Sequence, residues 1–314
     1  MIVLDDYQVG NTPTLLPDAP RIVVIGDVHG DLSRLTKVLL SLGIISRECK
    51  WIADPPNTVV VQMGDQLDSA SRVPPSIAKE WEAGGSSSDL DTVVFMDKLD
   101  RIAQAAGGRV ISLLGNHELM NYLGDFTYVS NPSMIATGGE LGRRAHFSSQ
   151  GNVGAILARR NVVVQIGKLL FVHGGILPHH LEVVGGDLRV INALARKLFR
   201  REALEPAEMI ACQALFIEPE GLLWTRRYAD NGNPALEPMI EAILTSQGAQ
   251  SIFVGHSTVS KVAPLFYGKL WLVDAMFSRS YGSEQYQVVD IRQLNRDGNP
   301  GGGPAYNAQI VTFS

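Results

Sequence analysis

Short apolar runs alternate with turn-forming residues through the first third of the chain. Residues 21–25, 58–63 and 109–114 are such runs, and each of them ends directly before or at a glycine-led turn. Apolar runs bounded by turn residues are typical of buried strands. Between them, residues 31–40 and 92–106 place apolar side chains at helical spacing. Strand, loop and helix therefore alternate, which predicts an α/β fold with parallel neighbouring strands.

The pattern changes in the second half of the chain. Two apolar runs, 161–166 and 168–172, flank Gly167 as the strands of a hairpin do. Helical spacing returns at 187–203 and 236–245, and strand-like runs follow at 251–254, 269–273 and 285–291, with a possible last strand at 308–313. The predicted architecture is two packed mixed β-sheets flanked by helices.

Breaker-rich segments mark possible boundaries. The glycine- and serine-rich stretch 84–88 and the glycine- and proline-rich stretch 298–304 are read as loops, because neither resembles a linker between independent domains. We therefore expect one catalytic domain at 21–296. An N-terminal extension at 1–20 precedes it, and a C-terminal tail at 297–314 follows it.

Composition narrows the class of protein without identifying it. The formal charge is −5 and gives no basic surface for nucleic acid. No apolar segment approaches the roughly 20 residues of a membrane helix, and the acidic, proline-containing start does not resemble a signal peptide. Cys49 and Cys212 match no metal or redox spacing, which favours free thiols and a cytoplasmic location. The oligomeric state is left open.

Polar clusters follow five of the predicted strands. They occupy 26–30, 64–68, 115–118, 173–175 and 255–256, and their candidate functional residues are Asp27, His29, Asp65, Asp68, Asn116, His117, His173 and His256. Ligands of open α/β sheets sit beyond the carboxyl ends of strands, where glycine permits close approach. One such Gly-Asp pair is usually only a turn. Five of them in one chain favour a shared site.

The residue types point to metal ions. Aspartate, histidine and asparagine without a thiolate suit Mn²⁺, Fe or Zn²⁺. Two such ions about 3.5–4 Å apart hold a hydroxide for in-line attack at phosphorus, and Asp65 is well placed to bridge them. His146, His179 and His180 lack comparable surroundings, so we interpret them as structural.

The ordered motifs GDxHG, GDxxD, GNHE, HGG and GH resemble those of the calcineurin-like metallophosphoesterases. Many phosphodiesterases and nucleases of that group carry a metal-binding histidine two residues after the last motif. Here Ser257 and Thr258 follow His256, as in the phosphoprotein phosphatase branch. The stretches 115–129, 171–179 and 223–228 are similar to the Shewanella-like phosphatases.

The resemblance implies a role for each candidate. Two divalent ions are expected, Mn²⁺ before Fe or Zn²⁺, and their activated hydroxide attacks a phosphate monoester on a phosphoprotein. His117 would be the general acid, oriented by Asp68, because an alkoxide is a poor leaving group. The metal ligands would be Asp27 and His29 at the first ion, Asp65 as the bridge, and Asn116, His173 and His256 at the second.

One departure leaves alternatives open. The family usually reads GDxxDRG, and its arginine grips the substrate phosphate, whereas this chain has Ser69 and Ala70. The replacement cation is expected to be Arg226, with Arg227, Arg72 and, less favoured, Arg143 as alternatives. A nucleotide or dinucleoside polyphosphate hydrolase of the same fold is the first rival function. A metal-binding scaffold whose catalysis is impaired by Ser69 is the second.

Overall fold

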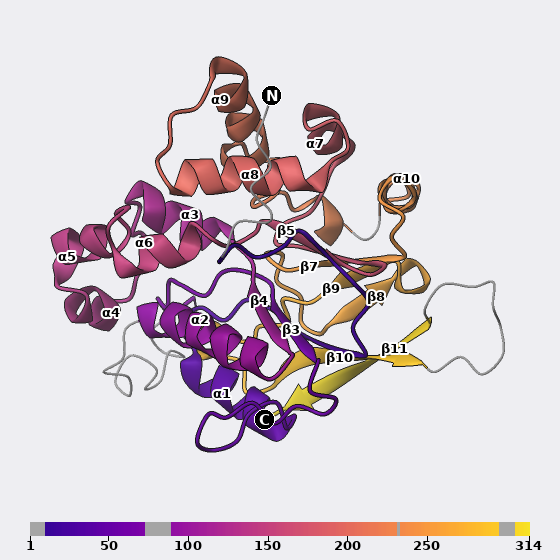
Figure 1. Cartoon of the computed structure of the whole chain (residues 1–314), viewed down its shortest axis with the longest axis horizontal. Helices are drawn as coiled ribbons and strands as arrows, with labels where there is room; N and C mark the ends of the chain where they lie inside the picture. Colours follow the sequence, from indigo (N-terminus) through magenta and orange to yellow (C-terminus); the bar gives the residue numbers. More distant parts are fainter. Residues whose placement is uncertain (1–9, 73–88, 231–232, 295–304) are drawn as a thin grey trace.

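The computed structural model describes residues 10–72, 89–230, 233–294 and 305–314. Two β-sheets lie at the centre of the molecule, and helices cover their outer faces (Figure 1). The predicted architecture of two mixed sheets flanked by helices is thereby confirmed. The loops expected at 84–88 and 298–304 lie outside the described residues.

The first sheet has five strands in the order β11-β10-β2-β3-β4. Its parallel half consists of β2 (Arg21–Ile25), β3 (Val59–Gln62) and β4 (Arg109–Ser112). Strand β10 (Tyr286–Leu294) runs antiparallel to β2, and β11 (Ala305–Phe313) runs antiparallel to β10 along its whole length. Half of the expected C-terminal tail is therefore the edge strand of this sheet.

The second sheet has six strands in the order β1-β5-β6-β7-β9-β8. The expected hairpin around Gly167 is present, because β5 and β6 pair antiparallel. Strand β7 then runs parallel to both β6 and β9. The strands are β1 (Leu15–Leu16), β5 (Val163–Ile166), β6 (Leu169–Val172), β7 (Ser251–Val254), β8 (Ala263–Leu265) and β9 (Leu270–Leu272).

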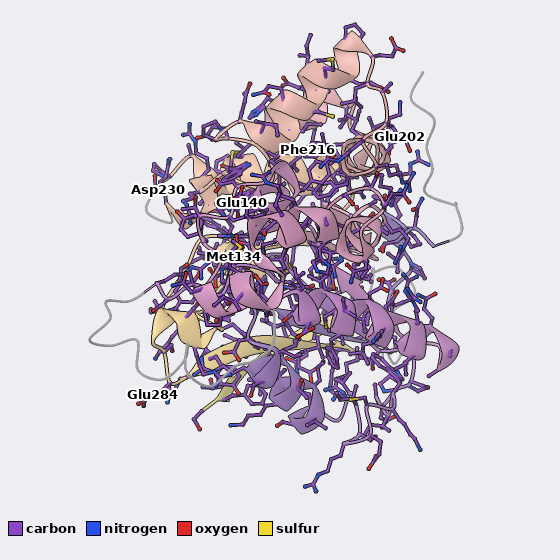
Figure 2. All side chains as sticks on the ribbon, turned by 90° about the vertical axis from the view of Figure 1, so that its left-hand side faces the viewer. Met134, Glu140, Glu202, Phe216, Asp230 and Glu284 are labelled. Atoms are coloured by element: carbon purple, nitrogen blue, oxygen red, sulfur yellow. The ribbon has the colours of Figure 1, made fainter. Side chains whose placement is uncertain are left out.

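Helices form separate layers above and below the sheets. In Figure 1, α1 and α2 lie beneath the five-stranded sheet, α7, α8 and α9 lie above the six-stranded sheet, and α3 to α6 gather at one side. In Figure 2, Phe216 and Glu202 mark the upper layer, while Met134 and Glu140 lie in the side group below it. The helices are α1 (Leu32–Ser41), α2 (Leu90–Ala105), α3 (Asn116–Leu123), α4 (Asn131–Ala136), α5 (Gly139–His146), α6 (Asn152–Leu157), α7 (Pro178–Val183), α8 (Leu188–Phe199), α9 (Pro206–Cys212) and α10 (Leu236–Ser246).

Burial on both faces explains why the central strands are apolar at every position. Side chains alternate across a strand, so Ile22 and Val24 enter the core between the two sheets, whereas Val23 and Ile25 enter the core against the lower helices. On β6, Phe171 enters the same intersheet core. A third core lies between the six-stranded sheet and the upper helices, where Val172 of β6 and Ile191 of α8 are buried. The molecule thus has four layers, two of helices and two of strands, with a buried core between each pair of neighbours.

One helix ends earlier than its pattern predicts. Helix α8 begins after Asp187, whose side chain accepts a hydrogen bond from the Arg189 amide, as an N-cap does. We expected it to reach residue 203, but it ends at Phe199. Arg201 has a positive φ of 56°, and this left-handed conformation cannot continue an α-helix.

No helix in the described ranges is long and apolar enough to cross a bilayer.

Phe253 provides a test of the intersheet core. Its ring stacks between Phe171 and Trp271, with centroid distances of 4.9 and 5.5 Å. Because Phe253→Ala leaves a cavity there, we expect it to lower the free energy of unfolding by about 3–5 kcal/mol in urea titrations. Leu141→Ala is the control, since Leu141 is 84% exposed, and its effect should stay within about 0.5 kcal/mol.

Candidate metal centre

The candidate residues meet where the carboxyl ends of two sets of parallel strands face each other. Asp27 and Asp65 follow β2 and β3 of one sheet, while His173 and His256 follow β6 and β7 of the other. Asn116 opens α3 directly after β4. All are buried, with side chains at most 6% exposed. The structure thus brings together the clusters from all five strand ends.

Asp65 stands at the centre of this site in an unusual backbone conformation. Its φ is 53°, a left-handed value that few residues other than glycine adopt. The Glu118 carboxylate stabilises the turn, because it accepts hydrogen bonds from the amides of Asp65 at 2.8 Å, Gln66 at 2.9 Å and Gly115 at 2.7 Å. A side chain at Gly115 would come within 2.2 Å of Asp65 Oδ1, so this crossing requires glycine.

A first group of possible ligands consists of Asp65, His173 and His256, whose donor atoms all lie within 4.8 Å of one another. His173 donates from Nδ1 to the Met63 carbonyl at 2.8 Å, and its Nε2 lies 3.3 Å from Asp65 Oδ2. His256 Nε2 lies 2.9 Å from the Trp224 carbonyl. Carbonyl acceptors fix the tautomer of each ring and leave the other nitrogen available to a metal ion.

Asn116 completes this first group, since its Oδ1 lies 3.0 Å from His173 Nε2. Burial lowers the pKa of His256 to about 3, helped by neighbouring His173. A neutral imidazole is the form that binds metal.

A second group consists of His29, Asp65 and His117, again within 4.8 Å. His29 Nδ1 lies 3.0 Å from the Leu67 carbonyl and 2.9 Å from Arg72 Nη2. Both cannot bond to this nitrogen in one tautomer, because the carbonyl only accepts and the guanidinium only donates. Donation to Leu67 leaves a lone pair on His29 Nε2, which lies 3.1 Å from the Tyr281 hydroxyl and is the nitrogen that could bind a metal ion.

Asp27 lies beside these groups without belonging to either of them. Its Oδ2 accepts a hydrogen bond from the His256 amide at 2.9 Å. Its Oδ1 is buried and has no hydrogen-bond partner in the described part of the chain. Burial raises the pKa of Asp27, and the nearby carboxylates Asp274 and Asp65 raise it further. A buried, unpaired carboxylate oxygen is the donor that a divalent cation would satisfy.

His117 is held by a carboxylate rather than by a carbonyl. Its Nδ1 lies 2.6 Å from Asp68 Oδ2, while Asn121 donates to Asp68 Oδ1 at 2.7 Å. The other ring nitrogen lies 3.8 Å from Asp65 Oδ2. Burial opposes the charged imidazole, but Asp65 and Asp68 outweigh it and raise the pKa of His117. Burial also raises the pKa of Asp68 despite the hydrogen bond from His117.

Two neighbouring histidines favour the charged form of the Asp65 side chain. Burial alone would raise its pKa, but His173 and His117 hold that pKa well below its usual range. The site therefore holds Asp65 as a carboxylate, the form that a bridging ligand needs.

The four candidate arginines occupy different surroundings. Arg226 donates to the His256 carbonyl at 2.8 Å and lines a cleft of about 440 Å³ together with Asn116, His117 and Tyr128. Arg72 lies on the side of His29, with its guanidinium 5.2 Å from the Tyr281 ring centroid. These two arginines are brought to the site.

Arg227 and Arg143 are engaged elsewhere. Arg227 is exposed, pairs with Glu220 at 3.0 Å and is not among the residues lining the cleft. Arg143 is completely buried and pairs with Asp89, whose carboxylate also accepts from the Asp68 amide. Arg143 therefore supports the loop that carries Asp68.

Sequence reasoning missed two acidic residues of the site. Glu118, within the GNHE motif, binds the backbone of the Asp65 turn, and Asp274 follows β9 at the same edge as His256. Burial raises the pKa of Asp274 to about 6, with a further contribution from Asp65. Its position after an apolar strand was a usable signal, but no glycine accompanies it.

Carboxylates, imidazoles and an amide that meet at the ends of parallel strands are donors typical of a divalent metal site. The family model described as calcineurin-like phosphoesterase matches residues 20–260. The chain belongs to this family and is a metal-dependent phosphatase, as the motif resemblance predicted.

Relatives and solved structures agree with this assignment. The chain is similar to Shewanella-like protein phosphatase 2 of Arabidopsis thaliana, with 30% identity over 87% of this chain and 75% of the relative. It is also similar to Shewanella-like protein phosphatase 1 of Plasmodium berghei, with 28% identity over 76% of this chain and 61% of the relative. A solved cold-active protein tyrosine phosphatase superimposes with a TM-score of 0.72 and 25% identity, over 89% of this chain and 76% of that one.

The histidines outside the site have ordinary roles. His180 lies within α7, accepts from the Leu177 amide at 3.0 Å and lies 2.9 Å from the Glu220 carbonyl. His146 bonds with Asn152, and the rings of His179 and His180 meet edge to face.

His180 generates a pH prediction. Burial lowers its pKa from 6.5 to about 4, so protonation is disfavoured in the folded state. The contribution of neutral His180 to the free energy of unfolding is fully present above pH 6.5, and it is lost as the pH falls towards 4. Between pH 7.5 and 4.5 the wild type should lose roughly 2–3 kcal/mol more than His180→Gln in urea titrations. Equal losses in both proteins would contradict a buried neutral His180.

Proposed function

We propose that this chain removes phosphate from phosphoserine, phosphothreonine or phosphotyrosine residues of proteins. The observation that carries the proposal is the placement of His117. Its ring is fixed by Asp68 on one side and opens with Asn116 and Arg226 onto the cleft on the other. A histidine held in this way can protonate a leaving alkoxide.

The proposed ligands are Asp27 and His29 for one ion, Asp65 as the bridge, and Asn116, His173 and His256 for the other. Support comes from the clustering of histidine nitrogens around the Asp65 carboxylate and from the unpaired oxygen of Asp27. A metal pair supplies an activated water and a clamp for the phosphate oxygens. We propose Mn²⁺ as the native ion, with Fe or Zn²⁺ as alternatives, because the donors are oxygen and imidazole.

Two arginines are proposed to replace the cation missing at Ser69. Arg226 and Arg72 lie on different sides of the metal pocket, near His256 and His29 respectively. Planar guanidinium groups match phosphate oxygens through paired hydrogen bonds. Arg227 is the weaker candidate, because Glu220 already holds it.

Boundaries and location are proposals as well. Residues 21–296 are proposed to be the catalytic domain, in line with the family match over 20–260. A cytoplasmic location is supported by the two cysteines, both of which are free thiols.

Substrate choice can be tested directly. Protein stripped of metal and reloaded with Mn²⁺, Fe²⁺ or Zn²⁺ would be assayed on a phosphopeptide panel, a dinucleoside polyphosphate and an aryl phosphate. We expect kcat/KM to be highest for phosphopeptides. Preference for the dinucleoside polyphosphate would replace the proposal with its first rival. Metal binding without turnover of any ester would favour the scaffold.

His117→Asn tests the acid role. Loss of the proton donor should slow hydrolysis of phosphoserine peptides about 10²–10⁴-fold, while an aryl phosphate with a good leaving group should be affected much less. Metal content should remain at the wild-type value. Loss of bound metal would instead make His117 a ligand, since it lies close to His29 and Asp65.

The arginines are compared through three single variants. Arg226→Ala and Arg72→Ala should each lower kcat/KM by about 10–100-fold, because each removes a charge-assisted bond to phosphate of roughly 1.5–3 kcal/mol. Arg227→Ala is the matched control and should change kcat/KM by less than about threefold. A larger effect for Arg227→Ala than for Arg226→Ala would reverse the assignment.

A further inference from the structure

Asp274 is a buried carboxylate whose role the proposed ligand set does not explain. It follows β9, which pairs with β7, so it lies at the same strand edge as His256. Its side chain is completely buried. One oxygen, Oδ2, accepts from the Thr258 hydroxyl at 2.9 Å, whereas Oδ1 has no hydrogen-bond partner within the described ranges.

Other buried carboxylates of the described chain are fully engaged. Asp290 accepts two hydrogen bonds from Arg21, at 3.0 and 2.8 Å, and Asp89 pairs with Arg143. Glu118 accepts from three backbone amides. The unpaired buried carboxylate oxygens in the described residues belong to Asp27 and Asp274. Within the described residues, buried carboxylate oxygens without a hydrogen-bond partner therefore occur only at these two positions.

Asp27 and Asp274 lie together. Gly26, directly before Asp27, packs so closely on the residues after β9 that an added Cβ would come within 2.4 Å of the Val273 carbonyl and 3.2 Å of Asp274 Cα. The amides of Val28 and His29, directly after Asp27, donate to the Asp65 carbonyl at 3.0 and 2.9 Å. Three carboxylates thus share one buried volume.

Buried like charges are costly unless cations compensate them. Two divalent ions carry four positive charges, of which Asp27 and Asp65 offset two. A third carboxylate in the same volume complements the remaining charge.

Thr258 connects this observation to the motif that the chain lacks. Thr258 occupies the position, two residues after His256, where many relatives carry a metal-binding histidine. Its hydroxyl instead holds Asp274. A residue of the segment after β7 thus holds a carboxylate that follows β9.

We propose that Asp274 is a further carboxylate of the metal centre, held by Thr258, which stabilises the ion bound beside Asp27 and His29. Asp274 acts on this ion by direct contact or through its charge, and both forms predict weaker binding when the charge is removed. The proposal rests on the dinuclear centre and is independent of the substrate.

Asp274→Asn is the principal test, because asparagine keeps the shape and removes the charge. The metal content of each protein, its Mn²⁺ affinity by competition with a chelator, and its unfolding midpoint with chelator and with Mn²⁺ would be measured at pH 8. One of the two Mn²⁺ ions should bind about 10–100-fold more weakly. The unfolding midpoint should rise in chelator, and the stabilisation by Mn²⁺ should shrink.

Asp290→Asn is the matched control. Asp290 is also buried, but it pairs with Arg21 and lies away from the site in β10. Its substitution should lower the midpoint equally with and without Mn²⁺ and should leave both affinities unchanged. This opposite response separates a metal-directed carboxylate from one that only supports the fold.

Thr258→Val keeps the test decisive if Asp274→Asn fails to fold. This variant retains the carboxylate without its donor, and the same ion should bind several-fold more weakly. Wild-type affinity for both ions in the folded variants, or a lower chelator midpoint in Asp274→Asn, would overturn the proposal. Wild-type protein that binds no Mn²⁺ would overturn the dinuclear centre too, whereas two ions in the wild type and unchanged binding in the variants would remove Asp274 alone.

Discussion

The concentration of buried carboxylates between two sheets is the interaction on which the site depends. Asp27 and Asp65 reach this volume from one sheet, while His173 and His256 approach from the other. An isolated carboxylate is costly there, so the surrounding imidazoles and amides, and cations when they bind, would compensate the negative charge. This requirement explains why turns with left-handed backbone conformations are retained at Asp65, Asp68, His29 and His256.

Much of the fold could be predicted because its signals are local. Strands buried on both faces are apolar throughout, and glycine marks the turns that carry Asp27, Asp65 and Asn116. The helices α4 to α6 were missed, since six to eight residues span too few turns to show a periodic pattern. Strands β1 and β8 are shorter still, and pairing with neighbours defines them.

Site contacts between residues that are far apart along the chain could not be predicted from the sequence. Arg143 was a candidate for phosphate, yet it pairs with Asp89, which lies 54 residues earlier. Nothing in its neighbourhood along the chain indicates that partner. Ser69, the residue in place of the usual arginine, bonds with Ser130 at 2.8 Å. Ser69 thus takes part in a polar contact within the protein, whereas the Arg72 and Arg226 guanidinium groups reach the site from loops.

The meeting of the two sheets also gives the metal ions a mechanical role. The Asp27 carboxylate and the His256 amide are 229 residues apart in sequence and are joined by one hydrogen bond. Ions held between these segments would close a loop of nearly the whole family domain, much as a covalent cross-link does. The two sheets would then separate only when the metal ions are released. Loss of metal would therefore lower the resistance to proteolysis together with the catalytic activity.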